Sequence, residues 1–324
     1  MRCLALAQAW KARVGEVTFI SVCASDALCQ RIKKEGLRLV RLGCSYPDPA
    51  DLDVTSRVLG EQSEAWLVLD GYGFDSEYQH EIKKNGHRLL VIDDTASLPR
   101  YYADVILNQN INAERLYYNC DASTRLLLGS QYVLLRSEFL VWRGVNREIS
   151  KIAGRVLITL GGADPTNQTL KVLRALQHTN IEGIEVRIVI GACNAHIETP
   201  QSSVAASGKT YKFLRDVKNM ARLMNWADIA VSAAGSTSWE LAFMGVPFLT
   251  AILAQNQERI AKGLGEVGAA INLGWLHDLR EEELAQYLVG LVPRWEVRQR
   301  LSRMARELVD GLGAERVTAH LSEL

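Results

Sequence analysis

The stretch Arg155-Val-Leu-Ile-Thr-Leu-Gly-Gly-Ala-Asp-Pro-Thr-Asn167 decides the fold. An apolar run ends in a pair of glycines, and an aspartate and a proline follow. A second stretch, Ile229-Ala-Val-Ser-Ala-Ala-Gly-Ser-Thr-Ser-Trp-Glu240, repeats this order further along the chain. Each stretch predicts a buried strand, a tight loop and the start of a helix, which is the unit from which parallel α/β sheets are built.

The same alternation of short apolar runs and helical patterns extends along the whole chain. We expect strands at 17–21, 37–42, 66–69, 88–92, 105–107 and 125–128 in the first half, and at 156–160, 186–190, 229–232, 248–251 and 270–273 in the second. We expect helices at 2–13, 24–35, 51–62, 75–85, 166–178, 217–225, 237–244, 257–267, 280–291, 294–309 and 314–322. The first of these helices reads as amphipathic.

A chain of 324 residues is long enough for two domains. The polar stretch at 141–154 separates the two series of strands. We therefore expect an α/β protein with a Rossmann-like domain over 1–145, a second over 151–310, and a C-terminal helix over 311–324. Two doubly wound domains predict a ligand in the cleft between them, at the carboxyl ends of their strands.

Composition excludes several classes of protein. Lys plus Arg equals Asp plus Glu, 37 against 37, which argues against a nucleic-acid partner. The six cysteines show no CxxC spacing, so we expect buried free thiols in a cytoplasmic protein rather than zinc ligands or disulfides. No stretch is apolar enough to predict a membrane span, and the first ten residues do not predict a signal peptide. The sequence does not indicate an oligomeric state.

The loop after 229–232 has the chemistry of an anion site. Gly235, Ser236 and Thr237 bring free backbone N–H groups and hydroxyls to the positive end of a helix, which favours a diphosphate. Glu240 lies one turn into that helix, where a carboxylate can bind the hydroxyls of a ribose. An ordinary solvated helix glutamate is an equally good interpretation of Glu240. Two such loops in one half of the chain predict a nucleotide-sugar ligand.

The loop after 156–160 is less suited to phosphate. Gly161 and Gly162 permit a turn and a close approach of a ligand to the backbone. Asp164 reads as the N-cap of the next helix, with Pro165 in its first position, and its carboxylate competes with a phosphate for the same N–H groups. This loop is therefore expected to face a sugar or to line the cleft; a simple strand-to-helix turn is the alternative.

Further polar residues follow other strands. Asn256 and Gln257 are placed to bind a sugar or phosphate, although Asn256 is also a plausible helix N-cap. Asp70 and Tyr72 end a strand of the first half and suit a cleft, or a turn in which Asp75 caps the next helix. The adjacent carboxylates of Asp93 and Asp94 are better interpreted as part of a turn than as a metal site, and we predict no metal. The six histidines follow no strand-end pattern, so none is assigned as a general base.

The following segments together resemble the UDP-sugar hydrolases of pseudaminic acid biosynthesis, which cleave UDP-2,4-diacetamido-2,4,6-trideoxy-β-L-altrose, and the related spore-coat polysaccharide proteins. They are Met1-Arg-Cys-Leu-Ala-Leu-Ala7, Asp70-Gly-Tyr72, Leu90-Val-Ile-Asp-Asp94, Asn108-Gln-Asn110, Leu127-Leu-Gly-Ser-Gln-Tyr-Val-Leu-Leu-Arg-Ser-Glu-Phe139, Gly161-Gly-Ala-Asp-Pro165, Ala233-Ala-Gly-Ser-Thr-Ser-Trp-Glu240, Asn256-Gln257 and Asp310-Gly-Leu-Gly-Ala-Glu-Arg-Val317. They run in family order over nearly the whole chain.

The resemblance implies a GT-B architecture, with UDP on the C-terminal domain and the sugar meeting the N-terminal domain. It also implies hydrolysis at the anomeric carbon without a metal or other cofactor, with Tyr72 and Asn256 in supporting roles. In the family, a loop resembling Gly-x-Gly-His precedes the segment that starts at Met1 here, and its histidine is the expected base. That histidine is expected to lie upstream of residue 1, so the catalytic base is left unassigned.

Three functions follow as hypotheses. The first is a UDP-sugar hydrolase. The second is a GT-B glycosyltransferase that passes the sugar to an acceptor, and the third is a UDP-sugar-binding protein without turnover, because the histidine loop is absent from this sequence.

Overall fold

The computed structural model describes residues 1–13, 15–23, 25–61, 64–179, 181–191, 194, 196 and 209–324. The predicted α/β class is confirmed, and every strand pairing is parallel. The chain divides into two units: Met1–Ser137 with Leu312–Leu324, and Glu138–Gly311. The C-terminal helix, which the sequence assigned to neither domain, is thus part of the first unit.

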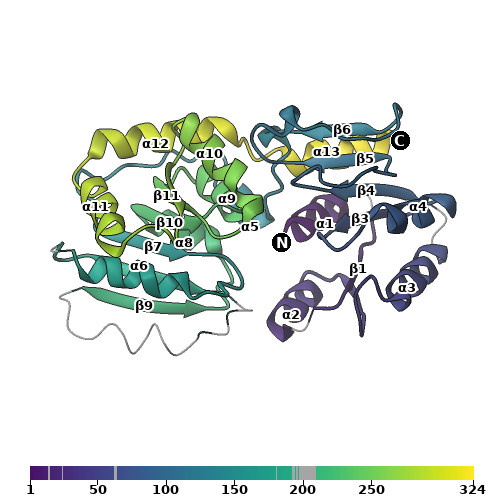
Figure 1. Cartoon of the computed structure of the whole chain (residues 1–324), viewed down its shortest axis with the longest axis horizontal. Coiled ribbons are helices and arrows are strands. Elements are labelled where there is room, and N and C mark those ends of the chain that lie inside the picture. Colours follow the sequence, from purple (N-terminus) through teal and green to yellow (C-terminus); the bar gives the residue numbers. More distant parts are fainter. Residues whose placement is uncertain are drawn as a thin grey trace. The chain divides into compact units, whose positions relative to one another are not determined.

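The first unit contains two parallel sheets (Figure 1). The smaller pairs β1 (Thr18–Ser21) with β2 (Arg38–Arg41). The larger contains β3 (Trp66–Asp70), β4 (Arg88–Ile92), β5 (Val105–Asn108) and β6 (Arg125–Leu128), in chain order. Its helices are α1 (Arg2–Arg13), α2 (Asp26–Lys34), α3 (Pro49–Gly60), α4 (Ser76–Lys84) and α13 (Gly313–Glu323), with short 3-10 helices at Ala113–Arg115 and Ser130–Tyr132.

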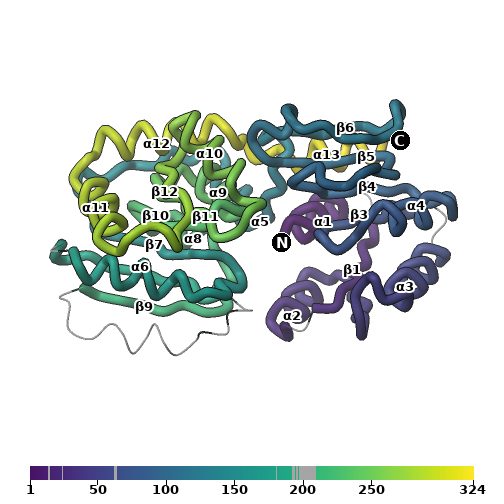
Figure 2. The backbone as a smooth tube through the Cα atoms, in the orientation of Figure 1, coloured from purple at the N-terminus to yellow at the C-terminus, as the bar shows by residue number. Residues whose placement is uncertain are grey.

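Helix α1 is buried on more than one side, which corrects the expectation of an amphipathic helix. Ala5 and Leu6 pack in a cluster with β4, β5 and α13, whereas Leu4 and Ala7 pack with Leu37 beside the small sheet. Figure 2 traces the chain from the second unit back to the first, where α13 completes this core. Helix α1 therefore serves as a central element of the first unit.

The second unit is built on one six-stranded sheet in the order β12-β11-β10-β7-β8-β9. The first strand in the chain, β7, lies in the middle, and the chain adds strands first on one side and then on the other. This is a doubly wound sheet whose strand order switches between β7 and β10, the place where such sheets bind ligands. Its strands are β7 (Arg155–Thr159), β8 (Glu185–Ile190), β9 (Thr210–Arg215), β10 (Ile229–Ala233), β11 (Phe248–Ile252) and β12 (Ile271–Trp275).

The helices of the second unit surround this sheet in Figure 1. They are α5 (Ser137–Leu140), which spans the division between the units, α6 (Gln168–Gln177), α8 (Met220–Trp226), α9 (Ser236–Phe243), α10 (Glu258–Glu266), α11 (Glu281–Leu291) and α12 (Trp295–Leu308). The apolar strands and the inner faces of α6 and α11 form one large core.

The sequence predicted these elements well but missed β9. This strand lies at the edge of the sheet, and its Thr-Tyr-Lys-Phe-Leu-Arg sequence contains no buried residue. The expectation of buried thiols is also corrected. Of the five described cysteines, all are free and only Cys29 is buried; Cys193 lies outside the described residues.

Candidate functional site

Three of the predicted loops leave neighbouring strands of the second unit at one edge of its sheet. Parallel pairing sets Ser232 of β10 beside Thr159 of β7, and Ala233 of β10 beside Ala251 of β11. Because the chains run in the same direction, the loops that follow β7, β10 and β11 all start at the carboxyl edge. These loops carry the glycine pair, the Gly-Ser-Thr segment and the Asn-Gln pair that the sequence singled out.

Helix α9 presents an open N-terminus at this edge. Gly235 is its N-cap and has no side chain with which to cap the first turn. Below it, the buried Ser238 hydroxyl donates to the Ala233 carbonyl at 3.1 Å, and the Trp239 side chain is 1% exposed. The helix is therefore anchored from its inner side, while Ser236 at its start is exposed. Glu240 lies within the helix and is half-buried.

The loop after β7 has a different arrangement. Gly161 adopts a left-handed backbone with φ 93°, and both glycines of the pair are exposed. The Asp164 carboxylate is buried and accepts hydrogen bonds from the N–H groups of Gln168 at 2.7 Å and Thr169 at 2.9 Å. The predicted occupation of the helix start by this carboxylate is therefore confirmed.

The predicted boundary of α6 is wrong. The helix begins at Gln168 with Asn167 as its N-cap residue, so neither Asp164 nor Pro165 takes its predicted position. Both Asp164 and Asn167 have left-handed backbones, with φ 40° and 53°. Because of these turns, a short loop separates Asp164 from the start of α6. The Asp164 side chain extends across this loop to the first N–H groups of α6.

The loop after β11 forms a short 3-10 helix, Gln255–Gln257, that leads into α10. Gln257, not Asn256, occupies the N-cap position of α10, so the capping alternative for Asn256 is wrong. The Gln257 side-chain carbonyl accepts from the Leu253 N–H at 2.9 Å, which fixes this turn.

Two residues at the same edge were missed by sequence reasoning. Gly191 follows β8, and a Cβ there would lie 2.2 Å from the Gly162 carbonyl oxygen, so only glycine lets the chain pass the glycine pair so closely. His196 lies next to the same loop, and its Nε2 donates to the Pro165 carbonyl at 2.9 Å. A glycine directly after a strand was the available signal for Gly191; nothing in the local pattern pointed to His196.

A second polar cluster lies at the carboxyl edge of the four-stranded sheet in the first unit. Arg2 contacts Asp70 at 2.7 Å and Asp94 at 2.6 Å. Asp94 also accepts from the Tyr72 hydroxyl at 2.7 Å and from the Asn110 amide at 2.6 Å. Burial lowers the pKa of Arg2, but the two carboxylates outweigh it and raise this pKa above its ordinary value. The ion pair therefore remains charged.

The other strand-end acids of the first unit have structural partners. Asp93 accepts from the N–H groups of Thr95 and Ala96, as expected of a turn, and Asp75 caps α4 through the Tyr78 N–H. Across the described ranges, no group of three or more His, Cys, Asp and Glu side chains is placed to hold a metal ion. No helix of the described chain is long and apolar enough to cross a membrane.

Comparisons with known proteins agree with this architecture. Residues 155–315 match the glycosyltransferase family 28 C-terminal domain. The chain is 28% identical to the spore coat polysaccharide biosynthesis protein SpsG of Bacillus subtilis over 260 residues, which cover 80% of this chain and 76% of SpsG. It is 26% identical to the UDP-2,4-diacetamido-2,4,6-trideoxy-beta-L-altropyranose hydrolase of Campylobacter jejuni over 214 residues, which cover 65% of this chain and 74% of that enzyme.

Solved structures with the same fold cover nearly the whole chain. MurG of Acinetobacter baumannii superposes with a TM-score of 0.68 at 16% identity, covering 100% of this chain and 95% of MurG. The S. aureus MnaA–UDP co-structure superposes with a TM-score of 0.70 at 10% identity, covering 99% of this chain and 92% of MnaA. The protein thus has a GT-B fold, and its residues 155–315 are similar to the glycosyltransferase family 28 C-terminal domain. More particularly, it is a distant relative of SpsG and of the UDP-sugar hydrolases.

Proposed function

We propose that this protein hydrolyses a UDP-linked diacetamido-trideoxy sugar and releases UDP and the free sugar. The observation that carries the proposal is the contrast between two helix starts at the carboxyl edge of the second unit. A carboxylate already occupies the start of α6, whereas the start of α9 has a glycine N-cap. Only the second can offer its first N–H groups to a diphosphate.

The proposed contacts follow from this placement. Gly235, Ser236 and Thr237 bind the diphosphate through backbone N–H groups and hydroxyls, and Glu240 binds the ribose hydroxyls. Gly161 and Gly162, on the neighbouring strand, are proposed to line the sugar side of the same ligand. Asn256 and Gln257 are proposed to contact it near the diphosphate or the sugar.

The proposed substrate comes from the relatives. The similarity to the Campylobacter jejuni hydrolase supports the sugar class, and the similarity to SpsG supports a role in making surface polysaccharide. A role in making nonulosonic acids is supported by the similarity to the pseudaminic acid cytidylyltransferase and hydrolase of Helicobacter pylori. In the proposed reaction, a water oxygen attacks the anomeric carbon and the bond from that carbon to the UDP oxygen breaks. UDP leaves with the bonding electrons, and the attacking water loses a proton to a base. Tyr72, held by Asp94, is the proposed contact to the sugar from the first unit.

The test is hydrolysis of the UDP-sugar in ¹⁸O-labelled water, followed by mass spectrometry of both products. The proposal predicts ¹⁸O in the free sugar and none in UDP. Label in the phosphate would show attack at phosphorus and contradict it. Tight UDP-sugar binding without any product would instead support a binding protein.

A glycosyltransferase is the second candidate, because the C-terminal domain matches glycosyltransferase family 28. Transfer and hydrolysis differ only in whether an acceptor hydroxyl or water attacks the anomeric carbon. Product analysis with and without candidate sugar acceptors separates them: a glycosylated acceptor would favour transfer, and free sugar that is unaffected by acceptor would favour hydrolysis.

A further inference from the structure

The two units of the chain share one order of strands, except at a single position. In the second unit, the first strand, β7, lies between the second strand, β8, and the fourth, β10. The third strand, β9, extends the sheet beyond β8, and β11 and β12 extend it beyond β10. A doubly wound sheet of this order is built outward from its first strand.

The first unit repeats this order around a different centre. Its β1 and β2 pair as β8 and β9 do, and β3, β4 and β5 follow one another as β10, β11 and β12 do. Among the described residues, however, no strand lies between β1 and β3, and these two strands belong to separate sheets. The correspondence with the second unit therefore sets one strand position, that of β7, between β1 and β3.

Helix α1 covers this position. Leu4 and Ala7 pack in a cluster with Phe19 of β1, and Leu6 packs in a cluster with Val68 of β3. In the second unit, α6 packs in the same core as the strands β7, β8 and β10. The helix α1 thus has the place in the first unit that α6 has in the second, where α6 is the helix that follows the central strand.

The strands on either side of this position are less buried than their counterparts. All five residues of β10 and three residues of β8 are buried, whereas β1 has no buried residue and β3 has only Leu69. The half-buried residues include the apolar Phe19, Trp66 and Val68. Parallel strands are normally covered on both faces, and an apolar strand with an unpaired edge is ready to pair with another segment.

The backbone groups at the open edge of β1 follow from its pairing with β2. The Val17 carbonyl accepts from the Arg38 N–H at 3.3 Å, and the Ser21 carbonyl accepts from the N–H of residue 42 at 3.0 Å. Successive residues of a strand direct their backbone N–H and C=O groups to opposite edges. Thr18 and Ile20 therefore direct theirs away from β2.

The same reasoning applies to β3. The Leu89 carbonyl of β4 accepts from the Asp104 N–H, at the entry to β5, at 2.9 Å. The next residue, Leu90, therefore directs its backbone groups toward β3, where it lies opposite Val68. In a parallel pair, only one of two opposite residues bonds to the other strand. Val68 thus directs its N–H and C=O to the edge of β3 that faces away from β4.

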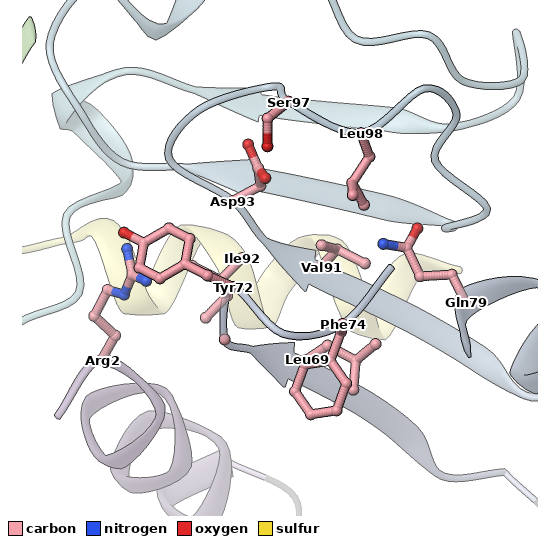
Figure 3. Close-up of a pocket in the computed structure, with 11 residues that line it drawn as sticks. Arg2, Leu69, Tyr72, Phe74, Gln79, Val91, Ile92, Asp93, Ser97 and Leu98 are labelled. Carbon is pink, nitrogen blue, oxygen red and sulfur yellow. The ribbon is translucent and has the colours of Figure 1, made fainter. Parts of the chain in front are cut away.

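The start of α1 lies where a strand in this position would end. Arg2 contacts the Asp70 carboxylate at 2.7 Å, and Asp70 is the last residue of β3. Figure 3 shows the Arg2 side chain beside Tyr72, which follows that strand. A strand parallel to β3 ends at the same edge, so a loop there can join it to α1 as the loop after β7 leads into α6.

We propose that the open edges of β1 and β3 bind one extended, apolar segment that lies parallel to both and is joined to the start of α1. It pairs with Thr18 and Ile20 on one side and with Val68 on the other, and it unites the two sheets of the first unit. Its counterpart β7, in which four successive residues are buried, indicates an apolar run of similar length. The proposal is independent of the proposed function.

The first test is amide hydrogen exchange of the full chain, measured by NMR at several protein concentrations. The amides of Thr18, Ile20 and Val68 should exchange at least about tenfold faster than those of Phe19 and Leu69, which face the paired edges. Equally slow exchange of all five amides would overturn the proposal, because the edges would not be open. Protection of the first three that rises with concentration would overturn it in favour of a second copy of the chain.

The second test adds a strand in front of Met1. The added segment is a copy of residues 155–167, which contain β7 and its loop, and the matched control carries Ile158→Pro within the copy, because proline is not tolerated in a central strand. The copy should slow exchange at Thr18, Ile20 and Val68 at least about tenfold and raise the Tm, and the proline control should do neither. Slowing in neither strand, in only one strand, or to the same extent with the control would overturn the proposal.

Discussion

Adding a carboxylate to the N-cap of α9 should strongly weaken UDP binding without destabilising the protein. The change is Gly235→Asp. Gly235 has an extended backbone, φ −126° and ψ −158°, and a Cβ built there meets no atom within 4 Å. An aspartate therefore fits, and its carboxylate can accept from N–H groups of the first turn, as Asp164 does at α6. The substitution converts the proposed phosphate site into a copy of the occupied one.

The magnitude follows from two opposing effects. As an N-cap, aspartate is better than glycine by a few tenths of a kcal/mol, so the free energy of unfolding should stay constant or rise slightly. Against a bound diphosphate, a carboxylate about 4 Å away is unfavourable by about 4 kcal/mol at an effective dielectric constant of 20. Solvent at this partly exposed loop reduces that figure to about 2–3 kcal/mol, which corresponds to a Kd raised roughly 30- to 150-fold.

The assay is isothermal titration with UDP, together with thermal unfolding of each variant. Gly235→Asn is the matched control, because asparagine caps the helix with the same shape and no charge. Gly235→Asp should bind UDP much more weakly than Gly235→Asn, and the gap should narrow at high salt. If the two variants bind UDP within threefold of each other, the diphosphate does not lie at α9 and the reasoning fails.

Three further outcomes follow from the structure. Gly191→Ala should weaken UDP-sugar binding at least tenfold, because its Cβ displaces the backbone at Gly162. The control Gly290→Ala, whose Cβ meets no atom within 4 Å inside α11, should raise the free energy of unfolding by about 0.5–1 kcal/mol. Titration measures the binding and denaturant unfolding the stability, and unchanged binding in Gly191→Ala would contradict the close approach. Asp164→Ala should lower the free energy of unfolding by about 1–2 kcal/mol. Asp164→Asn should lower it by less, since asparagine tolerates a backbone φ of 40°. Equal losses in denaturant unfolding would argue against the hydrogen bonds from the Gln168 and Thr169 N–H groups to Asp164. Asp228→Asn should lower the free energy of unfolding by about 2–3 kcal/mol at pH 7. The difference from wild type should become smaller as the pH falls below about 4, and urea unfolding at a series of pH values measures it. A difference that does not change with pH would contradict the prediction.

The sign of the Asp228 effect comes from its surroundings. Burial alone would raise the pKa of this carboxyl, but hydrogen bonds from Arg155 and from the Gly154 N–H outweigh burial and lower it below its ordinary value. The folded state therefore favours the charged form. That stabilisation is complete above the unfolded pKa and is lost as the pH falls through the lower, folded pKa.

The sequence alone predicted the strands of the second unit and the edge at which its loops meet. Apolar runs that end in glycine are a local pattern, and parallel pairing then brings the ends of β7, β10 and β11 together. The role of Asp164 was also visible, because an acid after a glycine pair is typical of a helix start. The exact start of α6 was not, because left-handed turns at Asp164 and Asn167 depend on the surrounding structure.

Features that depend on long-range contacts were beyond the reach of local patterns. Arg2 binds Asp94 across 92 positions of sequence. Gln79 has the sequence pattern of an ordinary polar helix residue, but in the described chain it is buried, its amide oxygen accepts from the Tyr102 N–H and its amide nitrogen has no hydrogen-bond partner. The strand β9 lacks the apolar run by which the central strands were recognised. In each case the partner, not the local sequence, determines the role.

The most direct measurement is a crystal structure of the protein with UDP. We expect the diphosphate oxygens to accept hydrogen bonds from the backbone N–H groups of Ser236 and Thr237, with the ribose hydroxyls on the Glu240 carboxylate and the Asp164 carboxylate still bound to the start of α6. A diphosphate bound at Gly161 and Gly162, with the start of α9 left to solvent, would contradict the proposed site.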